Sequence, residues 1–150
     1  MKGKGAYTVL IFYSYQTIVE PEQVASWLTS LARSYGLLGR AIVAHEGINA
    51  TFEGKTEDTE KFAAAFKANV QFTEVWIKTS EGTGESFTKL SVKVRDEIVG
   101  TRFPKEVDPR HRTAPHLSAE ELKQWYESGK EFVVVDMRNV FRWVAAWRPH

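Results

Sequence analysis

Two periodicities of apolar residues alternate along this chain and predict the order of its secondary structure. The run Tyr7–Tyr15 is β-branched and aromatic throughout, which predicts a buried central strand. From Pro21 to Gly36 the apolar residues recur every three or four positions, which predicts a helix with a proline in its first turn and a left-handed glycine cap. The same period predicts a second helix over Glu57–Asn69, with Thr56 as its N-cap.

Shorter apolar runs predict the remaining strands. Ala41–Ala44 and Ala50–Glu53 indicate the two strands of a hairpin that turns through residues 45–49, where a glycine makes the turn. Val75–Thr79 indicates a fourth strand, and residues 80–86 are expected to form a flexible loop.

The next strand is apolar on one face and basic on the other. Apolar residues from Leu90 to Val94 alternate with polar ones, as expected for a strand at the surface or edge of a sheet. The basic residues of this alternation are Lys89, Lys93 and Arg95.

The predicted elements follow the order of a split βαβ sandwich: strand, helix, strand, strand, helix and strand, followed by an added strand. This order predicts an α+β domain of the ferredoxin-like or acylphosphatase-like type over residues 1–99. Residues 100–117 lose the pattern and carry three prolines, which indicates a linker between domains.

Regular structure is expected to resume in residues 118–150. Ser118 and Glu121 have the spacing of a capping box, so a helix is expected from there to Gly129, followed by an apolar strand over Phe132–Asp136. Because independent domains typically need about fifty residues, this region is expected to be the incomplete start of a domain.

Composition narrows the available chemistry. The net charge is +1, so any attraction to nucleic acid has to come from a local patch. No apolar run reaches the roughly eighteen residues that span a bilayer, so we expect a soluble, cytoplasmic protein with no membrane partner. The absence of cysteine excludes disulfides, a thiolate nucleophile and a thiolate zinc site, and the four scattered histidines have no metal-site spacing.

Two segments carry a resemblance to one bacterial family. Residues 39–54, GRAIVAHEGINATFEG, and residues 87–99, FTKLSVKVRDEIV, resemble the rhodanese-related tRNA uridine hydroxylases. The resemblance extends from Tyr7 to Asn139 and implies a ferredoxin-like front domain followed by the truncated, rhodanese-like α/β start of a second domain.

The resemblance implies a parent enzyme that uses molecular oxygen to convert the wobble uridine of tRNA to 5-hydroxyuridine, with no other identifiable cofactor. Such enzymes carry their reactive cysteine in the later rhodanese domain, so no catalytic residue is expected in this chain. The expected role is to position tRNA. Two alternatives stay open: an accessory domain of a rhodanese-type sulfurtransferase, and a protein-interaction domain without RNA binding.

The first candidate substrate-binding cluster lies in the hairpin connection. His45, Glu46 and Asn49 place an imidazole, a carboxylate and an amide close together, and they belong to the string most characteristic of the resembled family. The alternative is a turn in which Gly47 reverses the chain and Asn49 bonds its own backbone. We expect this loop to shape the substrate site and not to catalyse.

The second candidate cluster is the basic row Lys89, Lys93 and Arg95, extended by Arg102 in the linker. Alternate residues of a strand project from one face about 7 Å apart, a spacing suited to phosphates. The alternative is that edge lysines only prevent edge-to-edge aggregation.

Aromatic residues could supply stacking platforms for RNA bases, but most are expected in the core. Only Trp76 and Phe87 are expected to be free, and the central strand shows no aromatic pair typical of an RNA-recognition motif. Acylphosphatase activity is excluded because residues 14–20, after the first strand, contain neither glycine nor arginine to cradle a phosphate.

Overall fold

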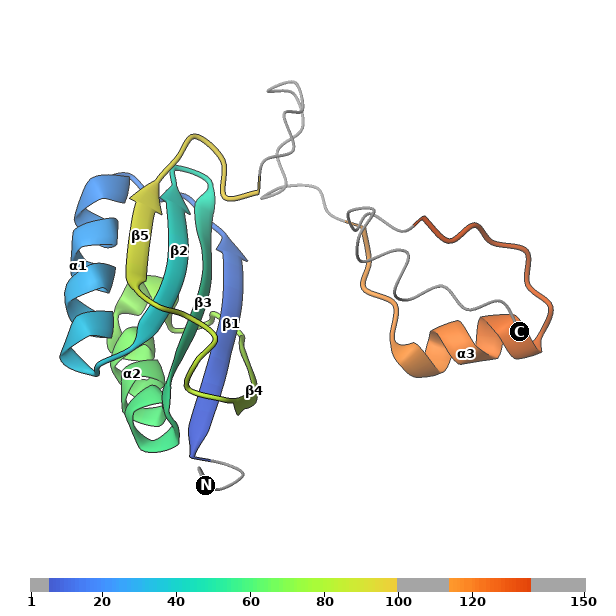
Figure 1. Ribbon diagram of the computed structural model, residues 1–150. Helices are drawn as coiled ribbons and strands as arrows, with labels where there is room; N and C mark the ends of the chain where they lie inside the picture. The colour runs from blue at the N-terminus through green and yellow to red at the C-terminus, as the bar shows by residue number, and fades with distance from the viewer. Residues whose placement is uncertain (1–5, 100–113, 136–150) are drawn as a thin grey trace. The chain divides into compact units, whose positions relative to one another are not determined.

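The computed structural model describes residues 6–99 and 114–135 (Figure 1). The chain divides after Thr113 into two compact units, and each is described by itself. The first unit has the predicted order of elements. They are β1 Tyr7–Tyr15, α1 Pro21–Ser34, β2 Leu38–Ala44, β3 Gly47–Lys55, α2 Thr56–Ala68, the 3₁₀ turn η1 Val70–Phe72, β4 Ile77–Gly82 and β5 Leu90–Val94.

These strands form one sheet in the order β4-β1-β3-β2-β5. Every neighbouring pair is antiparallel except β2 and β5, which are parallel. Because β3 lies between β1 and β2, the first unit is the predicted ferredoxin-like split βαβ fold. The added strand β5 lies at the sheet edge, as predicted.

Helices α1 and α2 pack against the same face of the sheet (Figure 1). The core between them and the sheet is rich in aromatic rings, and Trp27 stacks on Phe72 with 5.5 Å between ring centroids. Each fully buried phenylalanine contributes about 1.5–3 kcal/mol of transfer free energy. The fully buried phenylalanines are Phe12, Phe52, Phe62, Phe66 and Phe72.

The opposite face of the sheet, called the open face below, carries no helix of residues 6–99 (Figure 1). On β1, Leu10 and Phe12 point into the core, whereas Ile11 is 39% exposed and Tyr13 is 54% exposed. Strand β1 is therefore inside the sheet, as predicted, but the expectation that it is buried on both faces is wrong. Both helices cover the same side, so alternate residues face solvent.

Helix α1 ends as its sequence predicts. Gly36 has φ +64° and its amide N donates to Arg33 O at 3.0 Å, while the Leu37 amide N donates to Ala32 O at 2.9 Å. This pair of bonds is a Schellman cap, which satisfies carbonyl groups at the end of the helix.

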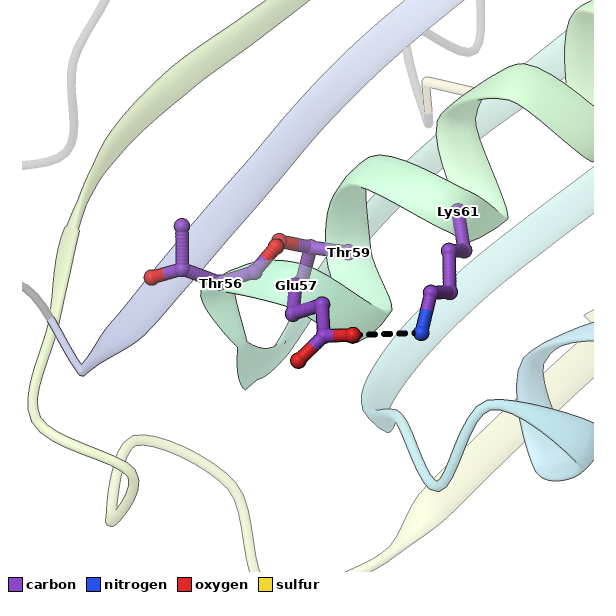
Figure 2. A network of polar contacts seen from close by, with 4 residues as sticks. All are labelled: Thr56, Glu57, Thr59 and Lys61. Atoms are coloured by element: carbon purple, nitrogen blue, oxygen red, sulfur yellow. Dashed lines mark hydrogen bonds and ion pairs between the residues drawn. The ribbon is translucent and has the colours of Figure 1, made fainter.

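Helix α2 differs from its prediction at the first residue. Thr56 is already helical and does not cap, because β3 runs directly into the helix. Its hydroxyl instead bonds the Thr8 hydroxyl at 3.0 Å and ties the helix to β1. Within the first turn, Thr59 Oγ1 donates to Thr56 O at 2.7 Å. One turn further along, Lys61 pairs with Glu57 at 2.6 Å (Figure 2).

Three predicted strands are longer than the apolar runs that indicated them. The hairpin turns through only His45 and Glu46, so β3 begins at Gly47 and includes Asn49. Strand β2 begins at Leu38, before the predicted run. Strand β4 begins at Ile77, later than predicted, and continues to Gly82 through the first part of the predicted loop, because it pairs with β1 along its whole length. Polar residues are accommodated in β4 because it is an edge strand of the sheet.

In the second unit, α3 spans Ala119–Glu127 and opens on the predicted capping box. Glu121 N donates to Ser118 Oγ at 3.1 Å, and Ser118 N donates to the Glu121 carboxylate at 2.9 Å. The strand predicted from Phe132 is not formed over residues 132–135, because no strand among residues 114–135 pairs with it. Asp136, where that prediction ended, lies outside the described residues.

Candidate nucleic-acid interface

Strand register decides which side chains share the open face. One row across the sheet joins residues that are direct partners on adjacent strands, and it begins and ends with polar groups. In order from β4 to β5, the row is Lys78, Ile11, Thr51, Arg40 and Ser91. The next row is Tyr13, Asn49, Ile42 and Lys93.

The basic row predicted on β5 is present at the edge of the open face. Lys93 is the β5 partner of Ile42 on β2. Lys89 and Arg95 continue the backbone pairing of β5 with β2 at its two ends. Gly39 N donates to Lys89 O at 3.1 Å, and Arg95 N donates to Val43 O at 3.0 Å. All three side chains are exposed, and Leu90, Val92 and Val94 pack against the core, as the alternation predicts.

Two further cations, Arg40 and Lys78, join this face, and the sequence analysis did not include them. Both are exposed, and no carboxylate within residues 6–99 forms an ion pair with either. Register was the signal that could have found them, since each is a row neighbour of Ile11 or Thr51. Arg102, the linker member of the predicted row, lies outside the described residues.

A hollow of about 330 Å³ opens between β2 and the loop that leads into β5. Two cations, three hydroxyl groups and one aromatic ring line it, and its lining contains no carboxylate. Such a set suits a phosphodiester, because cations and hydroxyls supply charge and hydrogen-bond donors. The lining residues are Gly39, Arg40, Ser86, Phe87, Thr88, Lys89 and Ser91.

The cluster predicted in the hairpin makes backbone contacts that fix neighbouring segments. Glu46 Oε1 accepts from Ile98 N at 2.7 Å, and Asn49 Nδ2 donates to Ile98 O at 3.2 Å, so the two side chains hold the buried Ile98 from both sides. His45 Nδ1 lies 2.9 Å from Ile18 O. Asn49 does not bond its own backbone; it lies in β3 and faces Tyr13.

The three predicted residues, His45, Glu46 and Asn49, lie in two different parts of the fold. His45 and Glu46 occupy the turn, and Asn49 lies on the open face beside the aromatic pair Tyr13 and Tyr15. Burial raises the pKa of the Tyr15 phenol, and the negative charge of Glu46 raises it further. Tyr15 is therefore neutral and a hydrogen-bond donor at physiological pH.

The aromatic expectation needs one correction. Trp76 is 72% exposed, as expected, and Phe87 is half-buried, but Tyr13 is also 54% exposed on β1. Its ring centroid lies 6.4 Å from that of Tyr15 in an edge-on arrangement. The open face therefore carries an aromatic pair on an interior strand, which the sequence analysis missed because both faces of β1 are apolar.

Glu53 is a further residue that sequence analysis missed. Its carboxylate, 4% exposed, accepts hydrogen bonds from the amides of Thr83, Gly84 and Ser86 and from the Ser86 hydroxyl, all at 2.8–2.9 Å. Burial acts to raise the pKa of Glu53, but these bonds outweigh it and lower the pKa. The loop expected to be flexible is thus held in place, and Ser86 also lines the hollow.

No cluster of three or more His, Cys, Asp or Glu side chains suited to a metal occurs within residues 6–99 and 114–135. Over the same residues, no helix has the length and apolar character needed to cross a membrane.

Comparison with known proteins decides the family. The family model of the UPF0176 acylphosphatase-like domain matches residues 7–98, which are the whole sheet and both of its helices. The chain belongs to this family. The match confirms the predicted relationship on the part of the chain that carries the open face and the hollow.

Relatives of this UPF0176 domain include two proteins of Staphylococcus aureus, from strains bovine RF122 / ET3-1 and MRSA252. Each is named tRNA uridine(34) hydroxylase and is 38% identical over 133 residues. The alignment covers 89% of this chain but 42% of each relative, so the chain spans less than half of their length. Among solved structures, the BLUF protein BlrB in its dark state aligns with a TM-score of 0.51 and 14% sequence identity. The alignment covers 63% of this chain and 75% of the BlrB chain, and the likeness shows a shared fold alone.

Proposed function

We propose that this chain is the tRNA-positioning part of a tRNA uridine hydroxylase, acting on the wobble uridine in the cytoplasm. The observation that carries the proposal is the set of exposed cations on the open face. These cations come from three different strands of that face: Lys78 from β4, Arg40 from β2, and Lys93 and Arg95 from β5 and the residue after it. Lys89 lines the hollow. Family membership and the names of the relatives support the choice of tRNA as the nucleic acid.

The local charge matters because the chain as a whole is nearly neutral. At net charge +1, a general attraction to RNA is weak. Cations grouped on one face neutralise adjacent phosphates and release their counterions, which is the main source of affinity for a nucleic-acid backbone. Edge protection does not account for Arg40, because Arg40 is on the interior strand β2 and not on an edge of the sheet.

In this proposal His45, Glu46 and Asn49 shape the site. Glu46 and Asn49 fix Ile98 and so hold the chain in place directly after β5. Asn49 lies on the open face as the β3 partner of Tyr13, and its amide nitrogen is used by the bond to Ile98 O. The loop therefore supports the surface that receives tRNA.

The chemistry is assigned outside this chain. Molecular oxygen is the proposed co-substrate, and a thiolate in a rhodanese domain is the proposed nucleophile that adds to the pyrimidine ring. This chain contains no cysteine, and a neutral imidazole or a carboxylate is a poorer nucleophile toward a uracil ring.

The test is the salt dependence of tRNA binding by the 150-residue chain. Changing Lys89, Lys93 and Arg95 together to alanine should flatten the slope of log affinity against log salt by about 2 to 3 units, because up to three phosphate contacts are lost. Affinity is measured by fluorescence anisotropy of labelled tRNA from low to physiological salt.

A matched control removes the same charge from the helical side. Arg33, Lys61 and Lys67 are exposed on α1 and α2, and changing them together to alanine should leave the slope unchanged. Equal slopes for both triple variants, or no tRNA binding by the unaltered chain, would refute the proposal.

A further inference from the structure

We propose that the open face is a stacking platform for the unpaired bases of single-stranded RNA, with Tyr13 as its principal contact and Tyr15 as its support. This inference rests on the proposed function and extends it by naming the part of the tRNA that is bound. It predicts that the chain holds an unpaired loop and not the double-helical stem.

The exposure of Tyr13 is the first observation. Tyr13 is on an interior strand, on the face that neither helix covers, and 54% of its surface faces solvent within its unit. Tyr15 contacts it edge-on at 6.4 Å between ring centroids, which restrains the ring and leaves a face free. A restrained, exposed aromatic face is what a base needs for stacking.

The arrangement of cations around this pair is the second observation. Lys78 is the β4 partner of Ile11, one step along β1 from Tyr13 on the same face. Lys93 lies in the same row as Tyr13 and three strands away, a separation of about 14 Å. Cations thus lie on both sides of the aromatic centre, where a strand crossing the sheet would place its phosphates while its bases lie over the rings.

The composition of the face also argues against another protein as its occupant. Apart from Glu53, whose carboxylate is used by four hydrogen bonds to the loop, the open-face positions paired in the sheet carry no acid. The other paired positions carry aromatic, basic, hydroxyl and aliphatic side chains, and the carboxylates that act on the aromatic pair, Glu46 and Glu97, lie outside these positions, near Tyr15. The aromatic and basic members of this set are complementary to a polyanion that has exposed rings. Asn49 lies between Tyr13 and Ile42; its amide nitrogen donates to Ile98 O, and its amide oxygen is the group that can accept a hydrogen bond from a base edge.

Double-stranded RNA fits this face poorly. Its bases are stacked on one another inside the helix, so an aromatic side chain on a sheet has no free base to contact, and the deep major groove excludes side chains. Unpaired loops have bases that can be splayed onto a surface. The anticodon loop, which contains the wobble position, is such a loop.

The experiment measures binding of the 150-residue chain to three probes of equal length: an oligouridylate, its abasic counterpart with the same phosphates, and a blunt RNA duplex. The oligouridylate should bind tightest. Changing Tyr13 to leucine, which keeps an apolar side chain but removes the ring, should weaken oligouridylate binding between about 5-fold and about 150-fold. Tyr13→Phe should bind within about twofold of the unaltered chain, because stacking does not need the phenol oxygen.

The outcomes separate this inference from the proposed function. Equal affinity for the abasic probe, together with an unchanged affinity of Tyr13→Leu, overturns the platform while leaving salt-dependent tRNA binding intact. A change in the molar mass of Tyr13→Leu by light scattering, without a change in RNA binding, also overturns it and assigns the face to a second copy of the chain. Failure of the unaltered chain to bind any RNA refutes both. Unchanged thermal unfolding of the variants is the control for folding.

Discussion

Replacing Gly47 with alanine is expected to destabilise the first unit by about 3 kcal/mol or more, through backbone strain and overpacking together. Gly47 has φ +151°, a conformation that side-chain-bearing residues rarely adopt. A Cβ atom there would overlap the carbonyl oxygen of Ser14 and lie 3.1 Å from the Cα of Tyr15. Both are backbone atoms of β1 in register with β3, so neither can withdraw without opening the sheet.

The measurement is the free energy of unfolding from urea titration. Gly36→Ala is a matched control, because Gly36 also has positive φ, +64°, but a Cβ atom there would meet no other atom within 4 Å. It should lose only the left-handed penalty, about 1–2 kcal/mol. Equal losses for the two variants would show that the close approach of β1 and β3 is not what requires glycine at Gly47.

Removal of the Glu53 carboxylate is the second change with a large expected effect. In Glu53→Ala the amides of Thr83, Gly84 and Ser86 lose their acceptor, and we expect a loss of about 3 kcal/mol. Glu53→Gln should also destabilise, because its NH₂ group would face an amide donor. The loop wall of the hollow should loosen, which hydrogen exchange of the Gly84 and Ser86 amides would detect.

The same carboxylate gives a pH dependence with a definite sign. The pKa of Glu53 is lower in the folded chain than in the unfolded chain, so acidification protonates the unfolded state first. The contribution of Glu53 is fully present above the ordinary glutamate pKa of about 4.3 and is lost as pH falls through the folded pKa. Urea titrations between pH 7 and pH 3 should show a flatter profile for Glu53→Gln; identical profiles would contradict this role.

The sequence predicted the fold well where periodicity was one-sided. Helix α1 and strand β5 each have one apolar face, and the structure confirms both elements. It also confirms the glycine cap that ends α1. Strand β1 could not be assigned in the same way, because Tyr7–Tyr15 is apolar on both faces. Which face stays open depends on where α1 and α2 pack, a tertiary property that the local pattern of β1 does not contain.

The candidate site was predicted in part for the same reason. Lys89, Lys93 and Arg95 lie in one short segment, so alternation alone grouped them. Arg40 and Lys78 are far apart in sequence and share the face only through strand register. Glu53 looked like an ordinary strand end, because its partners belong to a loop about thirty residues later.

We propose that this chain positions tRNA for chemistry performed elsewhere. The most direct measurement is the yield of 5-hydroxyuridine, by mass spectrometry of digested nucleosides, after hypomodified tRNA is incubated under oxygen. The 150-residue chain is compared with a longer protein that continues through a complete rhodanese domain with its cysteine. We expect product from the longer protein only, with a lower yield at limiting tRNA when Lys89, Lys93 and Arg95 are alanine. Product from the 150-residue chain alone would contradict this proposal and place the chemistry in the first unit.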